Sequence, residues 1–232
     1  MRVNAVIVAA GEGRRMGNAT PKVFLPLHGK PLIVHTLRGF AAARNVEKVI
    51  LVIAEAEMAR CEAIIRADEG LTKHHYVLQA GGPRRQDSVR RGLSRLDEDC
   101  AVVVIHDGAR PLVRPDLIDQ CIEAAWKEGA VVVGLPARDT IKMVSEDGRV
   151  CQTLPRDHFW QIQTPQAFRV ELIRAAYEAA AKENADATDD ATLVERIGQR
   201  VVVLEGDPLN IKVTVREDLW IAETFMQKKL PN

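Results

Sequence analysis

The sequence predicts an α/β fold built around a mostly parallel sheet, and two observations carry that prediction. Short runs of β-branched and other apolar residues alternate along the chain with longer amphipathic segments. Most of the short runs are continuously apolar, which is typical of strands that helices cover on both faces. Strand and helix repeated in this order indicate parallel pairing through right-handed crossovers.

The elements follow one another without an internal repeat or a linker rich in Pro, Gly or Ser. The expected strands are Val6–Ala10, Val49–Ala54, Tyr76–Leu78, Ala101–Ile105, Ala130–Leu135 and Val201–Leu204. The expected helices are Pro31–Arg44, Glu55–Ala67, Gln86–Leu96, Pro115–Glu128, Val170–Glu183 and Glu217–Lys229. In the third helix, Val89, Leu93 and Leu96 share one face at helical spacing. We therefore expect a single domain over residues 1–232.

One stretch interrupts the alternation. Residues 141–154 contain two β-like segments around Glu146-Asp147-Gly148-Arg149, and Asp-Gly strongly favours a hairpin. An α/β domain does not need a hairpin at this point, so an arm of about residues 138–158 is predicted to protrude or to pack on something. A second subunit is the more economical candidate for that contact, and a flap over the chain's own sheet is the alternative.

Composition restricts the class of protein. The chain is 47% hydrophobic and 28% charged, and its 32 Lys and Arg residues balance 32 Asp and Glu residues, so no overall field favours nucleic acid or an anionic membrane. No apolar run reaches the roughly 18 residues of a membrane span. The four cysteines (Cys61, Cys100, Cys121 and Cys151) form no CxxC pair, and all four are expected to be buried. These features predict a soluble, cytoplasmic protein.

The strongest motif follows the first predicted strand. It reads Ala9-Ala10-Gly11-Glu12-Gly13-Arg14-Arg15-Met16-Gly17, and Pro21-Lys22 comes soon after it. Glycines let backbone N–H groups approach phosphate at a strand's carboxyl end, and Arg and Lys add positive charge. The spacing is GxGxxxG rather than the dinucleotide fingerprint, and no acidic residue ends a second strand about twenty residues later. The loop therefore favours a triphosphate; a tight turn with solvated arginines is the alternative.

A second cluster, Ile105-His106-Asp107-Gly108-Ala109-Arg110-Pro111, closes the fourth predicted strand. A carboxylate such as Asp107 at a strand's carboxyl end suits Mg²⁺, which takes one or two carboxylates together with substrate phosphates and water. The alternative is a turn-forming Asp before Gly. We expect His106 to be a structural residue rather than a catalytic base.

A third cluster, Gly81-Gly82-Pro83-Arg84-Arg85-Gln86-Asp87-Ser88, precedes the third predicted helix. The glycine pair would let a flat base approach the backbone, and the Ser88 hydroxyl can bond the edge of a pyrimidine. Asp87 or Ser88 is also a candidate N-cap for the helix, and both roles are compatible.

These motifs occur in order with three others: Gln163-Thr164-Pro165-Gln166, Thr188-Asp189-Asp190 and Asn210-Ile211-Lys212-Val213-Thr214. Together they resemble the 2-C-methyl-D-erythritol 4-phosphate cytidylyltransferase family over nearly the whole chain. The resemblance implies a Rossmann-like nucleotidyltransferase fold, with a mostly parallel twisted sheet flanked by helices and an inserted β-hairpin arm. It also implies Mg²⁺-dependent use of CTP and a homodimer joined by the arm, in which we expect the active site to be shared across subunits.

The resemblance further implies roles for individual residues. It places Arg15 and Lys22 on the CTP phosphates as catalytic residues and Asp107 on Mg²⁺. The implied nucleotide-binding residues are Ala9, Ala10, Gly11, Gly13, Gly82 and Ser88. The residues implied to position methylerythritol phosphate are Arg156, Lys212, Thr140, Arg110, Thr164 and Thr188. Pro83 stands where the family often has an acidic residue, so the expected contact to the base at that position comes from the backbone.

The implied reaction is attack by the phosphate of methylerythritol phosphate on the α-phosphorus of CTP, which releases pyrophosphate. Three other functions are weighed against it. A cytidylyltransferase for another polyol phosphate, such as ribitol 5-phosphate, would look alike in its nucleotide half. The loop spacing opposes a dinucleotide-dependent oxidoreductase. A non-catalytic nucleotide-binding module would not require Arg156 and Lys212 to face the nucleotide.

Overall fold

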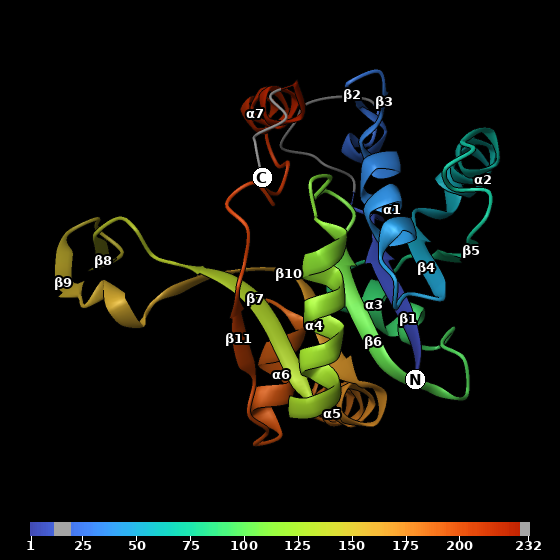
Figure 1. The fold of residues 1–232 in the computed structure, drawn as a ribbon. Coiled ribbons are helices and arrows are strands. Elements are labelled where there is room, and N and C mark those ends of the chain that lie inside the picture. Colours follow the sequence, from blue (N-terminus) through green and yellow to red (C-terminus); the bar gives the residue numbers. More distant parts are fainter. Residues whose placement is uncertain (12–19, 228–232) are drawn as a thin grey trace.

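In the computed structural model, which describes residues 1–11 and 20–227, helices surround a seven-stranded sheet of order β11-β7-β10-β6-β1-β4-β5 (Figure 1). Its strands are β1 (Arg2–Val8), β4 (Lys48–Ile53), β5 (His75–Ala80), β6 (Cys100–Asp107), β7 (Ala130–Pro136), β10 (Trp160–Arg169) and β11 (Val202–Glu205). All neighbours pair in parallel except β10, which is antiparallel to β6 and β7. The predicted fold class is confirmed, and each of the six expected strands is present.

The helices cover both faces of the sheet. They are α1 (Leu32–Ala42), α2 (Met58–Ala67), α3 (Arg85–Leu93), α4 (Pro115–Glu128), α5 (Val170–Glu183), α6 (Asp190–Arg196) and α7 (Arg216–Gln227). Phe40 of α1 and Ile118 of α4 belong to the core on one face, and Val89 of α3 and Ile173 of α5 belong to the core on the other. Because apolar layers lie on both sides, β4 is buried at every position, as its continuous apolar run predicts.

Besides short elements, one long strand and one helix were not predicted. The strand β10 is rich in glutamine, contains Pro165, and shifts register between Gln163 and Gln166, so it lacks the continuous apolar pattern of its neighbours. The short helix α6 follows Asp189, whose side chain accepts a hydrogen bond from the Thr192 N–H at 3.0 Å. That contact is the side-chain hydrogen bond typical of an Asp at a helix N-cap.

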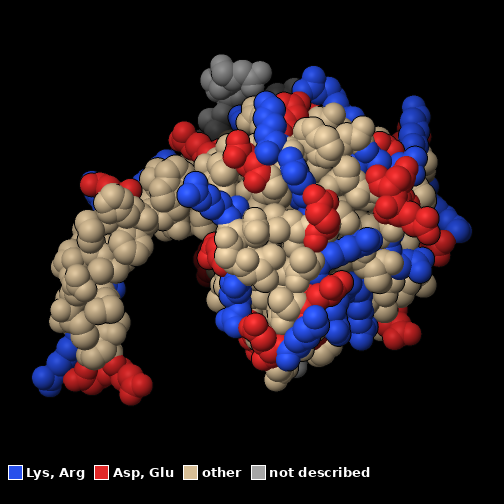
Figure 2. Space-filling view, turned by 90° about the horizontal axis from the view of Figure 1, so that it is seen from below, with Lys and Arg blue, Asp and Glu red and all other residues tan. Residues whose placement is uncertain are grey.

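The predicted hairpin consists of β8 (Ile141–Val144) and β9 (Val150–Leu154), which form a separate two-stranded antiparallel sheet. It projects far from the seven-stranded sheet on the extensions of β7 and β10 (Figure 1). Seen from below, it stands clear of the body, and most of its surface is neither basic nor acidic (Figure 2). The arrangement contradicts the alternative of a flap over the chain's own sheet.

The isolation of the hairpin also corrects one expectation about the cysteines. Cys61, Cys100 and Cys121 are buried, whereas Cys151 on β9 is exposed because no second layer covers that strand. All four are free thiols. Within residues 1–11 and 20–227, no helix is long and apolar enough to cross a membrane.

The remaining elements are short, and those before α2 lie near the upper edge of the sheet, whereas the turn at Arg156–His158 belongs to the arm (Figure 1). They are the strands β2 (Pro26–Leu27) and β3 (Lys30–Pro31) and three 3₁₀ turns at Lys22–Phe24, Glu55–Glu57 and Arg156–His158. A small apolar cluster of Leu27, Leu32, Val213 and Ala222 joins this region to α7. The chain after β11 is thereby held beside the carboxyl end of β1.

Candidate active site

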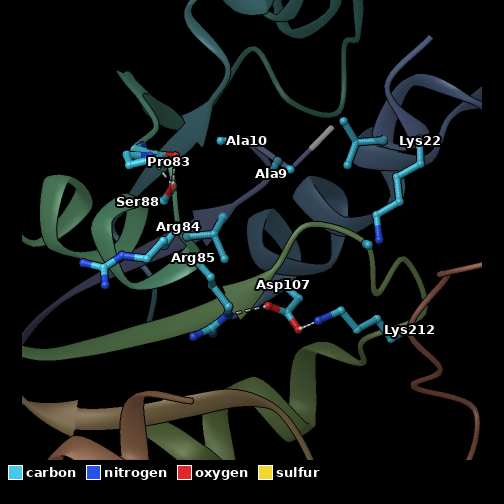
Figure 3. A pocket seen from close by; sticks show the side chains of 14 residues that line it. Ala9, Ala10, Lys22, Pro83, Arg84, Arg85, Ser88, Asp107 and Lys212 are labelled. Atoms are coloured by element: carbon cyan, nitrogen blue, oxygen red, sulfur yellow. Dashed lines mark hydrogen bonds and ion pairs between the residues drawn. The ribbon is translucent and has the colours of Figure 1, made fainter. Parts of the chain in front are cut away.

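A cavity of about 580 Å³ lies at the carboxyl ends of β1 and β6, beside the turn that leads into α3 (Figure 3). The parallel strands end at the same edge of the sheet, so loops distant in sequence meet there. The described residues that line it are Val8, Ala9, Ala10, Gly11, Lys22, Val23, Gly82, Pro83, Arg84, Arg85, Ser88, Asp107, Ala109 and Lys212. The cavity therefore brings together all three sequence clusters singled out above.

The glycine turn packs tightly against the end of β1. A Cβ on Gly81 would overlap the Cβ of Ala10, and one on Gly82 would overlap the Cβ of Asp87. The Gly81 N–H donates to the Ile53 carbonyl at 2.8 Å, which ties the turn to β4. The two glycines are thus required by close packing within the protein, in addition to any approach of a base.

The third cluster begins its helix earlier than expected. Because α3 starts at Arg85, the N-cap position is Arg84 without a side-chain cap, so the prediction of Asp87 or Ser88 as N-cap is wrong. The Asp87 carboxylate instead pairs with Arg84 at 2.9 Å. The Ser88 hydroxyl accepts a hydrogen bond from the Gly82 N–H at 3.0 Å, which fixes the turn.

Asp107 is the acidic residue of the cavity and is surrounded by cations. Its Oδ1 lies 3.1 Å from Arg85 Nε, and its Oδ2 lies 2.7 Å from Lys212 Nζ and 3.9 Å from Arg110 Nε. Figure 3 shows Arg85 and Lys212 approaching the carboxylate from opposite sides. Burial would raise the pKa of Asp107, but the three cations outweigh burial and hold that pKa well below its ordinary value. The side chain is therefore an anion at any physiological pH.

A chain of hydrogen bonds fixes the backbone beneath Asp107. The Asp107 N–H donates to Thr164 Oγ1 at 3.1 Å, and that hydroxyl lies 3.0 Å from His106 Nδ1. His106 Nε2 lies 3.3 Å from the Arg110 carbonyl, so Nε2 carries the proton and Nδ1 accepts from Thr164. Burial lowers the pKa of His106 to about 3, which keeps the ring neutral. His106 is a satisfied structural residue, as expected.

The segment 210–213 supplies a second wall of basic character. The Val213 N–H donates to the Ala109 carbonyl at 2.8 Å, and Lys22 Nζ donates to the Val213 carbonyl at 3.0 Å. Arg110 Nη1 donates to the Asn210 carbonyl at 2.7 Å. These contacts place Lys212 at the cavity and hold the Lys22 ammonium beside the same segment.

The predicted site residues divide into three groups. Ala9, Ala10, Gly11, Lys22, Gly82, Ser88, Asp107 and Lys212 line the cavity, and Arg110 and Thr164 lie buried next to Asp107. Thr140, Arg156 and Thr188 are exposed and are not among the described lining residues. Gly13 and Arg15 lie outside the described residues.

Arg85 is a cavity residue to which the sequence analysis gave no role. It is the first residue of α3 and bridges Asp107 to Asp190, whose Oδ2 lies 2.8 Å from Arg85 Nη1. Two adjacent arginines in the glycine turn were visible in the sequence, but only the start of the helix decides which one points inward. Arg84 points away from Asp107 in Figure 3, and Arg85 points toward it.

The donor set can be tested against a divalent cation. Among the described residues, no group of three or more His, Cys, Asp or Glu side chains gathers in a way that could hold a metal. Among the lining residues that the structure describes, Asp107 is the one carboxylate, and its neighbouring cations keep it ionised. One carboxylate beside room for phosphates fits Mg²⁺, which binds through one or two carboxylates and substrate oxygens, and does not fit a metal held by protein ligands alone.

The sequence and fold are similar to those of known proteins. The model of the 2-C-methyl-D-erythritol 4-phosphate cytidylyltransferase family matches residues 3–228. The enzyme of that name from Geotalea uraniireducens is 45% identical over 98% of this chain and 97% of its own. The crystal structure of 4-diphosphocytidyl-2C-methyl-D-erythritol synthase from Anaerococcus prevotii superposes with a TM-score of 0.86 at 30% identity, covering 98% of this chain and 99% of the other. The crystal structure of 2-C-methyl-D-erythritol 4-phosphate cytidylyltransferase from Thermus thermophilus superposes with a TM-score of 0.79 at 32% identity. The match covers 98% of this chain and 100% of the other.

A nucleotide-sized cavity of glycines and cations at the ends of parallel strands, on this fold, defines a nucleotidyltransferase. More narrowly, the chain belongs to the 2-C-methyl-D-erythritol 4-phosphate cytidylyltransferase family.

Proposed function

We propose that this enzyme transfers the cytidylyl group of CTP to 2-C-methyl-D-erythritol 4-phosphate in isoprenoid precursor biosynthesis. The products are 4-diphosphocytidyl-2-C-methyl-D-erythritol and pyrophosphate. The activity follows from membership of the family. The observation that carries it here is the cavity in which Lys22, Asp107 and Lys212 meet the glycine turn.

Charge stabilisation is the chemical task of the cavity. Attack by a phosphate on the α-phosphorus builds negative charge on the equatorial oxygens and on the departing pyrophosphate. Lys22, held by the Val213 carbonyl, is suited to meet that charge. The family resemblance implies the same task for Arg15. No covalent intermediate is required, because the acceptor phosphate is itself the nucleophile and is already deprotonated. Positioning and electrostatics then supply the catalysis.

Asp107 is proposed to hold Mg²⁺ together with the CTP phosphates. When bound, the ion would supply positive charge to the phosphate oxygens. Since Asp107 Oδ2 lies 2.7 Å from Lys212 Nζ, a cation at that oxygen would compete with the lysine. Lys212 would then have its ammonium group available for the phosphate of the acceptor.

The acceptor side of the site is proposed to be completed by a second copy of the chain. Thr140 and Arg156 flank the hairpin and are exposed, and Arg156 Nη1 donates to the Arg138 carbonyl at 2.6 Å. Met143, Val144 and Val150 expose 49%, 57% and 60% of their area on the hairpin. A protruding arm with exposed apolar side chains is suited to an intersubunit contact, and a two-fold axis would then give each site an arm from its partner. The free thiols are consistent with the cytoplasmic location that we propose.

The proposal is tested by incubating the protein with CTP and Mg²⁺ and one acceptor at a time. We expect pyrophosphate release with methylerythritol phosphate, and much slower release with ribitol 5-phosphate. Comparable rates with ribitol 5-phosphate would favour the related polyol-phosphate activity, and no release with either would contradict the assignment. The chain titrated with CTP alone serves as the control for a binding module without catalysis.

A further inference from the structure

The guanidinium of Arg85 lies between two carboxylates at the back of the cavity. Its Nε lies 3.1 Å from Asp107 Oδ1, and its Nη1 lies 2.8 Å from Asp190 Oδ2. Only 28% of the Arg85 side chain is exposed, and Asp190 is 1% exposed. Arg85 thus joins the acidic residue of the site to a carboxylate that no substrate can reach.

Asp190 is itself held from several elements. It is the first residue of α6, and its Oδ1 accepts a hydrogen bond at 2.6 Å from the hydroxyl of Tyr177, a buried residue of α5. The preceding residue, Asp189, caps α6 and accepts a hydrogen bond at 2.8 Å from Gln166 of β10. Arg85 therefore connects Asp107 to an anchor fixed by α5, α6 and the central sheet.

Charge balance does not explain why this anchor exists. Lys212 and Arg110 already flank Asp107 Oδ2, whereas Asp190 is a buried acid whose pKa is raised by burial although Arg85 opposes that effect. A planar guanidinium that bonds different carboxylates through different nitrogens fixes their relative orientation, which a lysine ammonium does less well. The arrangement immobilises Oδ1 of Asp107 and turns Oδ2 toward Lys212.

We propose that Arg85 is a positioning residue, which orients the Asp107 carboxylate toward the metal by holding it against the buried Asp190–Tyr177 pair. The inference rests on the proposed function, because it takes Asp107 as a ligand of the divalent cation. Partners that orient metal ligands commonly contribute about 10–100-fold to metal affinity or activity. Arg85 is expected to act in that range and only through Asp107.

The test measures metal binding directly and does not depend on turnover. Mn²⁺ is titrated into enzyme and CTP without acceptor, free Mn²⁺ is followed by electron paramagnetic resonance, and binding by CTP alone is subtracted. Arg85→Lys should weaken Mn²⁺ binding about tenfold or more. The matched control is Arg90→Lys on the same helix, whose side chain is 61% exposed and 3.9 Å from Asp87; its binding should stay within about twofold of wild type.

Asp107→Asn separates the inference from the function on which it rests. If Asp107→Asn binds Mn²⁺ as wild type does, the metal role of Asp107 is wrong. If Asp107→Asn weakens binding but Arg85→Lys does not, the positioning role of Arg85 alone is overturned. Adding Arg85→Lys to Asp107→Asn should cause no further loss if Arg85 acts through that carboxylate, and an additive loss would show an independent contact with the ligand.

A second variant covers the case in which Arg85→Lys fails to fold, which circular dichroism would reveal. Asp190→Asn keeps the shape of the side chain and removes its carboxylate. Unlike a change of Arg85, it leaves no buried carboxylate without its cation. It should weaken Mn²⁺ binding several-fold while the chain stays folded, since Arg85 then has only one anionic partner. Wild-type Mn²⁺ binding by a folded Asp190→Asn protein would overturn the proposal.

Discussion

The cavity and the hairpin arm hold their polar residues in opposite ways. In the cavity, Asp107 is fixed by Arg85, Lys212 and a hydrogen bond from its own backbone to Thr164. On the arm, the exposed Arg156 donates to the carbonyl of Arg138, a neighbour on the same segment. One region is cross-linked through several elements, and the other stands away from the body (Figures 1 and 2).

The difference indicates that one chain preorganises the residues of the cavity but not Thr140 and Arg156, which flank the arm. Backbone bonds through Val213 and Thr164 place the cavity residues before any ligand arrives. In the proposed dimer, Thr140 and Arg156 would gain a fixed position where the arm rests on the second subunit. The experiments below vary each region separately, so that each can contradict this division.

Lys22→Ala is expected to have the largest effect, because it removes a positioned cation from the cavity. We expect kcat to fall by roughly 10²-fold or more, on the scale of losing one preorganised donor. Steady-state pyrophosphate release measures the change, and Lys182→Ala on the exposed surface of α5 is the matched control. Activity of Lys22→Ala within twofold of wild type would remove Lys22 from the mechanism.

Asp107→Asn should raise the Mg²⁺ concentration needed for half-maximal activity by at least about tenfold. The physical reason is that the amide lacks the charge that the three neighbouring cations keep fully ionised in the wild type. Mg²⁺ titrations at saturating CTP measure the shift, and circular dichroism checks that the fold is intact. An unchanged titration would leave Asp107 as a turn-forming residue.

Subunit exchange tests whether the arm serves the neighbouring site. Lys22→Ala and Arg156→Ala are each expected to be inactive, but in a shared arrangement a mixed dimer has one intact site and one doubly defective site. Random mixing makes half of the dimers mixed, so about a quarter of wild-type activity should return. Exchange verified by mass spectrometry with no recovered activity would show that both residues serve one subunit's site.

Much of this arrangement could be predicted from sequence because it depends on local patterns. Continuous apolar runs located six strands, and the Asp-Gly turn located the hairpin. The strand β10 was not predicted because its polar residues bind partners that are far away in sequence. Gln163 donates to the Asp207 carbonyl, and Gln166 donates to Asp189. The role of Arg85 was not predicted for a similar reason, since its partners Asp107 and Asp190 follow it by 22 and by more than 100 positions.

The smallest effects are expected from replacing one glycine by alanine in each region, beginning with the cavity. Gly81→Ala places a methyl group where the Cβ of Ala10 already lies, so the turn or the end of β1 must shift. Overpacking of this kind destabilises by about 1–3 kcal/mol. Because the turn lines the cavity, we expect the KM for CTP to rise several-fold as well. Urea unfolding and steady-state kinetics measure the two changes.

Gly148→Ala is the matched substitution on the arm, and its strain has a different origin. Gly148 has a φ of +79° with nothing within 4 Å of an added Cβ, so alanine meets backbone strain of about 1–2 kcal/mol but no overlap. Asparagine tolerates this conformation better than alanine does, so Gly148→Asn should lower the free energy of unfolding less than Gly148→Ala. Gly81→Asn should instead lower it more than Gly81→Ala, because the larger side chain overlaps more. The hairpin lies apart from the cavity, so neither Gly148 variant should change the KM for CTP. A several-fold rise in that KM for Gly148→Ala would mean that the turn of the arm is coupled to the cavity, and the division between the two regions would be wrong.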